Sequence, residues 1–289
     1  AEDAYGSSPS AYRQNLVASL CNGFIASNGT LWTGNQYNDD IAWAVIAFSR
    51  AYLITGNTTF RDIARNNFDA MFSRAWDTSF AGGGLWWRTD KQGKNACING
   101  PAAIGACYLY GIFGDASYLN KAKNCYAWER RVLFNPGTGA ISDSIGTNNV
   151  YNTWASTYNQ GTFIGAANFL YRATGLPYYY QDAILAARYM QNSICSAGIF
   201  PEYGSGDFGG FNGIGVRWAA QFAKDQNLWP AFGPWLTANA NAAWSRRNTN
   251  NLAWQKWNTP TPAGTNVLDS WDCSDSVIVL SVASPSPGD

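Results

Sequence analysis

The chain has 289 residues, with 19 Lys and Arg against 19 Asp and Glu, and it contains no histidine. Balanced charge without basic clusters excludes a surface that attracts nucleic acid or an anionic membrane, so we expect a neutral partner. The lack of histidine excludes Ser-His-Asp and Cys-His catalysis and imidazole zinc sites, so acid–base chemistry would depend on carboxylates, Tyr, Lys or Cys. We expect neither a metal nor a cofactor.

The aromatic content is high for a chain with so little charge. It includes 14 Trp, 16 Tyr and 15 Phe, while charged residues make up 13% of the sequence. Aromatic rings have flat apolar faces, so this excess indicates stacking surfaces for a sugar, although about two thirds of the rings should simply fill the core.

The even composition predicts one domain over residues 1–283, with the Ser- and Pro-rich residues 284–289 as the start of a linker. The chain opens Ala1-Glu2-Asp3 without a hydrophobic leader, as expected of a secreted protein after signal removal. Apolar runs stay shorter than the ~18 residues of a membrane span, so we expect no spanning helix. We also expect a monomer.

Apolar residues recur at helical spacing through most of the chain, and the alternation typical of strands is scarce. Three similar segments, Tyr52 to Gly56, Tyr110 to Gly114 and Tyr171 to Gly175, each end a helix with glycine and repeat at intervals of about 60 residues. This pattern predicts an all-α fold, a toroid of helical hairpins. The expected helices lie near residues 10–25, 40–55, 58–75, 95–112, 116–133, 159–174, 178–195, 211–224, 231–247 and 268–283.

Longer connections fall at alternate joints, at residues 82–94, 135–158, 198–210 and 248–267, so they should gather at one end of the toroid. Several hold glycine beside aromatic residues, as in Gly82 to Trp87. Glycine lets a backbone approach a ligand closely while rings stack on it. Alternatively, these glycines only make turns.

The six cysteines are dispersed and form no CxxC pair, which favours up to three disulfides over a zinc or redox motif. They are Cys21, Cys97, Cys107, Cys125, Cys195 and Cys273. Their pairing stays open, except that Cys97 and Cys107, if on one helix, lie ~15 Å apart and do not bridge. Two sequons, at Asn28 and Asn57, agree with secretion and a glycoprotein.

Two adjacent acids, Asp39 and Asp40, stand at the start of the helix expected over 40–55. Asn38 or Asp39 could cap that helix, which is a common structural use of these residues. Capping does not use both acids, however. Neighbouring residues project about 100° apart, so the two carboxyl groups can face one site near the ~5–5.5 Å separation of retaining glycosidases. The helix N-terminus and mutual repulsion could then divide them into nucleophile and proton donor.

Five segments follow one another in the order and spacing of a known family. They are Asp39-Asp40 with Trp43, Gly83 to Trp87, Lys94 to Asn99, Thr157 to Gly161, and Phe211 to Arg217. In these segments the chain resembles glycoside hydrolase family 76, the endo-α-1,6-mannanases. The resemblance implies an (α/α) barrel and a retaining double displacement through a mannosyl-enzyme, with Asp39 as nucleophile and Asp40 as acid/base.

Two features differ from the family. Its barrel has more helices ahead of the acid pair than the single helix predicted here, so we expect a ring that is incomplete at the N-terminal side. Asn212 also stands where lysine is common.

Nine further residues are candidates for contact with the sugar. They are Trp86, Trp87, Asn95, Asn99, Asp143, Trp154, Tyr158, Gln160 and Arg217. Of the successive Trp86 and Trp87, one can stack on sugar while the other packs inward. Tyr158 and Gln160 belong to the most specific motif after the acid pair.

Four of these candidates have structural alternatives. Asn95 and Asn99 are four residues apart on one helix face, and could offer amides to hydroxyls or cap that helix. Asp143 could bind hydroxyls or hold its own loop, and Arg217 could orient a carboxylate.

The resulting prediction is a secreted retaining hydrolase acting inside an α-1,6-mannan chain. A wall-remodelling transglycosylase on mannan or a GPI glycan would share every catalytic residue. A sugar-binding toroid without turnover is a third alternative, which retention of both acids disfavours. A polysaccharide lyase is the least favoured, since lyases use His or Tyr bases and cationic grooves.

Overall fold

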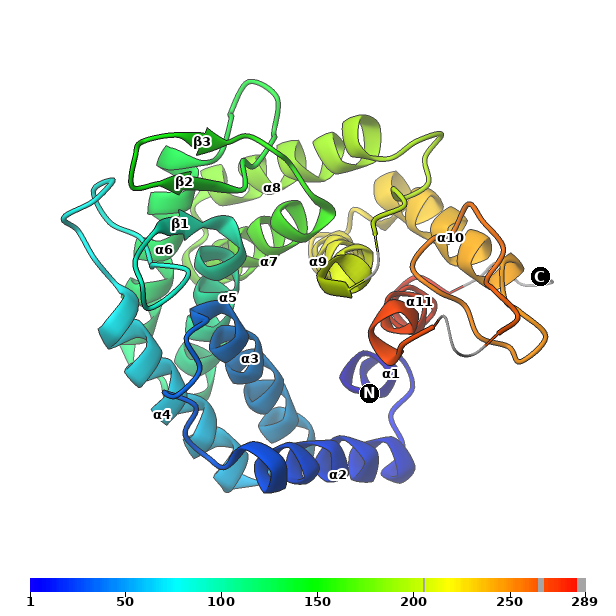
Figure 1. Cartoon of the computed structure of the whole chain (residues 1–289), viewed down its shortest axis with the longest axis horizontal. Helices are drawn as coiled ribbons and strands as arrows, with labels where there is room; N and C mark the ends of the chain where they lie inside the picture. Colours follow the sequence, from blue (N-terminus) through cyan, green and yellow to red (C-terminus); the bar gives the residue numbers. More distant parts are fainter. Residues whose placement is uncertain (205, 265–267, 285–289) are drawn as a thin grey trace. The chain divides into compact units, whose positions relative to one another are not determined.

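The computed structural model describes residues 1–204, 206–264 and 268–284 of the chain (Figure 1). The described residues group into two compact units. Unit 1 comprises residues 1–135, 141–154 and 169–176, and unit 2 comprises residues 136–140, 155–168 and 177–289. The single domain over 1–283 stays a prediction, and residues 285–289 of the expected linker lie outside the described part of the chain.

Unit 1 is built from helices that pack in consecutive pairs. Its helices are α1 (Glu2–Ser7), α2 (Ala11–Asn28), α3 (Asn38–Thr55), α4 (Thr58–Ala75), α5 (Ala96–Phe113) and α6 (Ala116–Val132). Helix α3 packs against α4 and α5, and α5 packs against α6 (Figure 1). The strands β1 (Gly93–Asn95), β2 (Ser144–Gly146) and β3 (Tyr151–Asn152) form a small antiparallel sheet in that order.

Unit 2 is helical as well. It holds the start of α7 (Thr157–Thr174), then α8 (Pro177–Tyr189), the π-helical turn η1 (Met190–Ile194), the 3-10 turn η2 (Gly206–Gly210), α9 (Phe211–Asp225), α10 (Trp229–Ser245) and α11 (Ser270–Val282). Helix α9 packs against α10 and α11, and α10 also packs against α11. The all-α prediction and all ten expected helices are therefore confirmed.

The glycine stops of the internal repeat act as predicted. Gly56, Gly114 and Gly175 have φ of 72°, 70° and 70°, in the left-handed region that glycine favours. Each glycine N–H donates to the carbonyl of the tyrosine four residues earlier, at 2.8, 2.8 and 2.7 Å. The motif thus satisfies a helix-end carbonyl three times in the chain.

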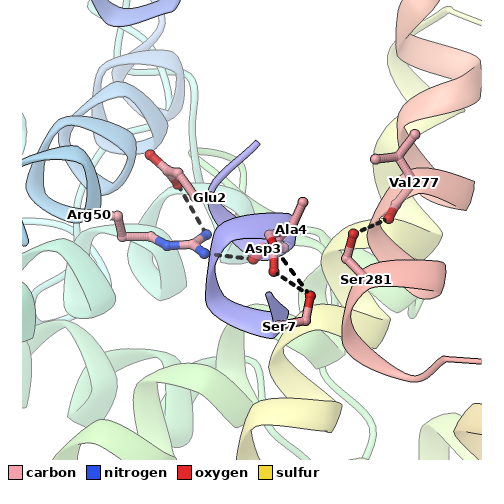
Figure 2. A network of polar contacts seen from close by, with 7 residues as sticks. All are labelled: Glu2, Asp3, Ala4, Ser7, Arg50, Val277 and Ser281. Carbon is pink, nitrogen blue, oxygen red and sulfur yellow. Dashed lines mark hydrogen bonds and ion pairs between the residues drawn. The ribbon is translucent and has the colours of Figure 1, made fainter. Parts of the chain in front are cut away.

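Helix α1 was not expected from the sequence, so two helices rather than one precede the acid pair. Every residue of α1 is at least partly exposed, and ion pairs hold it in place. Figure 2 shows Arg50 of α3 between Glu2 and Asp3, with N–O distances of 3.2 and 2.6 Å. A six-residue helix without a buried face has no apolar periodicity to reveal it. The expected incompleteness of the ring at its N-terminal side stays a prediction.

Helix α5 is the apolar centre of unit 1. Its 18 residues have a mean hydropathy of 1.3, so by length and composition it could cross a membrane, contrary to the expectation that no apolar run is long enough. In the structure 67% of that stretch is buried inside the protein. A buried core helix has the same composition as a spanning one.

The six cysteines are present as thiols, so the predicted disulfides are not confirmed. Cys107 and Cys125 are buried between the apolar residues of α5 and α6. Burial raises the pKa of Cys107 to about 12. Apolar surroundings of this kind favour the inert neutral thiol.

Candidate active site

The acid pair occupies the first turn of α3, but neither acid caps the helix. The N-cap residue is Tyr37, and its side chain makes no capping hydrogen bond. Asn38 is directed elsewhere: its Nδ2 donates to the carbonyl of Trp86 at 2.8 Å and its Oδ1 accepts from Arg74 at 2.7 Å. The capping interpretation of Asn38 and Asp39 is therefore wrong.

Asp39 is directed into the interior of unit 1. Burial, followed by the charge of Asp40, raises the pKa of Asp39 from 3.8 to about 7. The side chains of Trp87 and Cys97 lie near enough to oppose this rise by hydrogen bonding. Oδ1 of Asp39 and Nε1 of Trp87 are nevertheless buried without a hydrogen-bond partner within the described structure. Asp39 is thus an enclosed carboxyl group whose charge is poorly compensated.

Asp40, the next residue, is exposed. Its Oδ2 accepts a hydrogen bond from Nδ2 of Asn35 at 2.9 Å. The amide of Asn35 also accepts from the backbone N–H of Tyr37 at 2.8 Å, so its orientation is fixed. One helix turn therefore places two neighbouring carboxyl groups in different environments, one enclosed and one in contact with solvent.

Arg74, in the last turn of α4, holds the segment that carries the pair. It donates to the carbonyl groups of Thr33 and Asn35 and to the side chain of Asn38, each at 2.7 Å. A guanidinium can serve three acceptors in fixed directions. Arg74 could not be predicted from the sequence, because 36 positions separate it from Asn38 and no local pattern links them.

Trp86 packs inward. Only 4% of its surface is exposed, and its Nε1 donates to Asp77 at 2.8 Å. Its ring stacks on Phe80 at 5.5 Å between centroids, and Nζ of Lys94 lies 4.6 Å from the ring centre. With its ring covered in this way, Trp86 is an anchor of the loop, contrary to its selection as a sugar-binding residue.

Trp87, by contrast, is partly exposed. Its ring contacts Tyr37 at 5.4 Å, and its carbonyl accepts from the N–H of Asn38 at 2.9 Å. Trp87 therefore lies directly against the start of α3 and beside Asp39. Of the two tryptophans, it is the one with ring surface left for a ligand.

The loop around Trp86 is organised by Lys94, which begins one of the five motif segments but was not among the predicted site residues. Lys94 is fully buried, and its ammonium donates to the carbonyls of Asp77, Phe80 and Gly83 at 2.6, 2.9 and 2.6 Å. Burial lowers the pKa of Lys94 to about 8, while the charge of Asp77 opposes this change. Three short bonds to one loop make it rigid.

The glycines of this loop serve packing rather than approach to a ligand. Gly84 has a φ of 85°, and a Cβ there would overlap the ring of Trp128. Trp128 also donates to the carbonyl of Ala81 at 3.2 Å. The close backbone approach expected here therefore occurs, but toward α6.

The contacts of Asn99 favour a structural role, and sugar binding by Asn99 stays a prediction. It is fully buried, its Oδ1 accepts from the N–H of Leu85 at 2.9 Å, and its Nδ2 donates to the carbonyls of Leu85 and Asn95 at 3.3 and 2.9 Å. Asn95 differs, because its buried Oδ1 lacks a partner among the described residues. Neither amide caps α5.

A group of acids surrounds Cys97 at the start of α5. Burial raises the pKa of Cys97, and the charges of Asp39, Asp143 and Glu129 raise it further. Glu129 is fully buried, and neither of its carboxyl oxygens finds a hydrogen-bond partner in the described part of the chain. Burial raises the pKa of Glu129 well above its ordinary value, which favours the neutral acid.

Asp143 and Trp154 lie at the small sheet of unit 1. Oδ2 of Asp143 accepts from Nδ2 of Asn152 at 3.2 Å, which agrees with its alternative use in holding its own loop. Trp154 is 41% exposed. Both remain predictions as sugar ligands.

The other three candidates belong to unit 2. Gln160 is fully buried, and its Nε2 donates to the carbonyls of Gly139 and Ala186 at 2.9 and 3.0 Å. These bonds favour a structural role, and sugar binding by Gln160 stays a prediction. Tyr158 is 7% exposed and packs on Phe211 at 5.1 Å. It stays a prediction.

Arg217 acts on a carboxyl group within unit 2, as its structural alternative predicted. Burial raises the pKa of Asp275, and the charge of Arg217 opposes this rise. The same carboxyl group accepts the N–H groups of Asn212 and Gly213 at 3.1 and 2.6 Å. These contacts join α9 to α11.

The sequence profile described as Glycosyl hydrolase family 76 matches residues 13–282. The chain belongs to this family. The resemblance in the five motif segments is thereby confirmed, and it covers most of both units.

Solved family 76 structures have the same fold. The α-1,6-mannanase of a Salegentibacter species is 32% identical, with a TM-score of 0.89 over 98% of this chain and 85% of that chain. An inactive variant of that mannanase, in which two consecutive aspartates are replaced by asparagine, was solved with α-1,6-mannotriose. These neighbours are α/α toroid enzymes, which confirms the predicted fold class.

Two fungal proteins are more distant. Mannan endo-1,6-alpha-mannosidase DCW1 of Saccharomyces cerevisiae is 28% identical over 187 residues, which are 57% of this chain and 40% of that protein. The match thus spans less than half the length of this curated relative. Dfg5 from Chaetomium thermophilum, solved with glucosamine, is 15% identical with a TM-score of 0.84 over 98% of this chain and 77% of its own, a likeness of fold alone.

Proposed function

We propose that the chain is a secreted, monomeric, retaining glycoside hydrolase that cleaves α-1,6-mannosidic linkages within a mannan backbone. Membership of family 76 and the similarity to a structurally known α-1,6-mannanase support the reaction and the substrate class. The inactive double-asparagine variant of that enzyme supports catalysis by two adjacent aspartates. Absence of net charge supports a neutral polysaccharide.

The observation that carries this proposal is the unequal environment of Asp39 and Asp40 in one helix turn. Two carboxyl groups with separated environments are the recurring arrangement for dividing nucleophilic and acid–base work. The raised pKa of Asp39 gives it the proton in acidic solution, whereas the resemblance makes it the nucleophile. These two indications point in opposite directions for its role.

Solvent access supports the assignment of Asp39 as nucleophile. An ester on the enclosed Asp39 is shielded from uncontrolled hydrolysis, and an ionised Asp39 is reactive because its charge is poorly compensated. Asp40, which is exposed, can exchange protons with the departing sugar and with incoming water. A general acid that later acts as base needs that access in both steps.

In the first step, the Asp39 carboxylate attacks the anomeric carbon while Asp40 protonates the departing glycosidic oxygen, which forms a mannosyl ester and frees the leaving sugar. In the second step, Asp40 takes a proton from a water molecule while the oxygen of that water attacks the same carbon, and the Asp39 carboxylate leaves. Two inversions retain the α configuration. Arg74 and Asn35 would act as positioning residues, because they orient the first turn of α3 and the Asp40 carboxyl group.

The test is incubation with linear α-1,6-mannan and a panel of other α-linked polymers, with products sized and their anomers followed by NMR. We expect internal cleavage of the α-1,6 polymer with an α product formed first. An initial β product would overturn the retaining mechanism, and cleavage of another linkage alone would overturn the substrate. Peptide mapping of a mannosyl-enzyme trapped with a slow substrate should find the ester on Asp39, and an ester on Asp40 would reverse the roles.

A further inference from the structure

A cavity of about 250 Å³ adjoins Asp40 within unit 1. It lies between the last turns of α2, the connection to α3 and the first turns of α3. Its wall includes Phe24, Asn28, Trp32, Asn35, Asp40 and Ala44. The wall contains the proposed acid/base but, among the described residues, none of the nine positions selected from the sequence as sugar-binding.

One side of the cavity is aromatic. The rings of Phe24 and Trp32 meet edge to face at 5.3 Å, and Phe24 is 42% exposed although α2 carries it beside the protein core. Trp32 is fixed, because its Nε1 donates to the carbonyl of Gly29 at 3.0 Å and its backbone N–H donates to Asn67 at 2.7 Å. The exposed ring of Phe24 therefore has a rigid support.

The other side is polar. Asn28 and Asn35 bring amides, and Asp40 brings a carboxyl group, to the same small volume. A wall that is aromatic on one side and rich in hydrogen-bonding groups on the other suits a pyranose ring, which has an apolar face and a rim of hydroxyls. The volume is slightly below the ~300 to 1,000 Å³ of sites for drug-sized ligands, so it has room for one sugar ring.

The cavity is formed in advance of any ligand. Asn67 of α4 donates to the carbonyl of Thr30 at 2.8 Å, in addition to its bond with the N–H of Trp32. Arg74 of the same helix holds the carbonyls of Thr33 and Asn35. Two side chains of α4 thus fix the whole connection that forms this wall, and a preorganised site loses less entropy on binding.

We propose that this cavity binds the sugar residue on the leaving-group side of the cleaved bond and, after that residue departs, the acceptor that replaces it. The inference rests on the proposed function and adds where the leaving-group sugar, and later the acceptor, binds. Asp40 is part of the cavity wall, whereas Asp39 is not and interacts instead with Trp87 and Cys97. The group that Asp40 protonates has to lie on the Asp40 side.

The same geometry allows a sugar hydroxyl to replace water. A saccharide in the cavity would give its hydroxyl proton to Asp40 as the hydroxyl oxygen bonds to the anomeric carbon and the ester bond to Asp39 breaks. The product is a new glycoside with the α configuration, and no other reactant is required. The occupied cavity favours transfer, because a bound acceptor is already near the ester.

The test compares two substrates that differ only in the leaving group, α-1,6-mannotetraose and α-1,6-mannotriosyl fluoride. Fluoride leaves without a sugar in the cavity. Ala44→Phe fills the cavity from the second turn of α3, and Phe24→Ala removes the exposed ring. Ala47→Phe is the matched control, since Ala47 is on the same helix with similar exposure and lies outside the cavity wall.

We expect Ala44→Phe to lower the ratio of kcat/KM for the tetraose to that for the fluoride by about tenfold, which corresponds to ~1.4 kcal/mol. Phe24→Ala should lower it about threefold, as expected for one aromatic contact. Ala47→Phe should keep the wild-type ratio. An unchanged ratio in Ala44→Phe, or an equal fall in the control, would overturn the cavity assignment.

A second readout uses a labelled α-1,6-mannobiose acceptor with the fluoride as donor. Ala44→Phe should shift the products from transfer toward hydrolysis relative to wild type and to Ala47→Phe. If transfer is equal in all three, the acceptor does not use the cavity. Failure of the wild-type protein to cleave any α-1,6-mannoside would instead refute the proposed function, so the two failures are distinguishable.

Discussion

The two sides of the acid pair differ in almost every physical respect. On the Asp39 side, the carboxyl group faces Trp87 and Cys97, and the buried acid Glu129 lies near the same thiol. On the Asp40 side, an asparagine amide holds an exposed carboxyl group beside a preformed cavity. A rotation of about 100° between successive helical residues is sufficient to produce this contrast. Adjacency in sequence therefore says little about the environment of each acid.

The largest expected effect is on turnover. Asp39→Asn and Asp40→Asn should each reduce kcat by ~10²- to 10⁴-fold or more on the true substrate, because each removes a group needed in both chemical steps. Circular dichroism should find both variants folded. If either keeps more than about a tenth of the wild-type rate, that acid does not perform the chemistry proposed for it.

The next effect separates the two tryptophans. Trp86→Ala should cost ~3 to 5 kcal/mol of unfolding free energy, since Trp86 is buried and hydrogen-bonded to Asp77. Trp87→Ala should cost less stability and weaken oligosaccharide binding by ~1 kcal/mol. Thermal midpoints and titration calorimetry on both variants measure this. The reverse pattern would mean that Trp86 is the sugar-stacking ring.

A pH-dependent effect distinguishes the two acids by stability. The pKa of Asp39 is raised from 3.8 to about 7 in the folded protein. Between those values the folded state keeps a proton that the unfolded chain has lost, so the free energy of unfolding falls as pH rises. Asp39→Asn removes this penalty and should be more stable than wild type at neutral pH, by at most about 4 kcal/mol.

Below pH ~4 the Asp39→Asn variant and wild type should be equally stable, since both side chains are then neutral. Urea denaturation across this range, with Asp40→Asn as the comparison, measures the difference. Parallel pH profiles for wild type and Asp39→Asn would contradict the enclosed charge at Asp39.

The smallest of these effects concerns the support shared by both sides. Arg74→Lys should destabilise the protein by ~1 to 3 kcal/mol, because one ammonium cannot reproduce three directed bonds and leaves acceptors unsatisfied. Arg65→Lys, on the same helix with its side chain 42% exposed, is the control and should change stability by less than ~0.5 kcal/mol. Equal shifts in the denaturation midpoint of Arg74→Lys and Arg65→Lys would mean that the three hydrogen bonds of Arg74 do not stabilise this segment.

The sequence predicted the helices well because helical periodicity and glycine stops are local. Gly56, Gly114 and Gly175 each end a helix as their motif predicts. The short helix α1 was missed because its stability comes from Arg50, which is distant in the sequence, rather than from an apolar face.

The site was predicted less completely, because the partners of amides and cations are not local. Asn99 and Gln160 were chosen for their capacity to bind hydroxyls, yet their amides bind backbone groups of other segments. Lys94 and Arg74 bind carbonyls up to 41 residues away in sequence. Residue type indicates which bonds a side chain can form, while only the fold determines with which partner.

Asn28 gives the cavity an unexpected dependence on the host that makes the protein. It is exposed at the end of α2, starts a sequon, and its Nδ2 donates to the carbonyl of Phe24 at 3.0 Å. A glycan on that nitrogen would stand at the cavity beside the exposed ring of Phe24 and compete with an incoming acceptor. A glycan on Asn57, at the start of α4 and outside the cavity wall, would not. Protein made in a bacterial host and protein made in a glycosylating host would then have the same sequence but differ in their ratio of transglycosylation to hydrolysis.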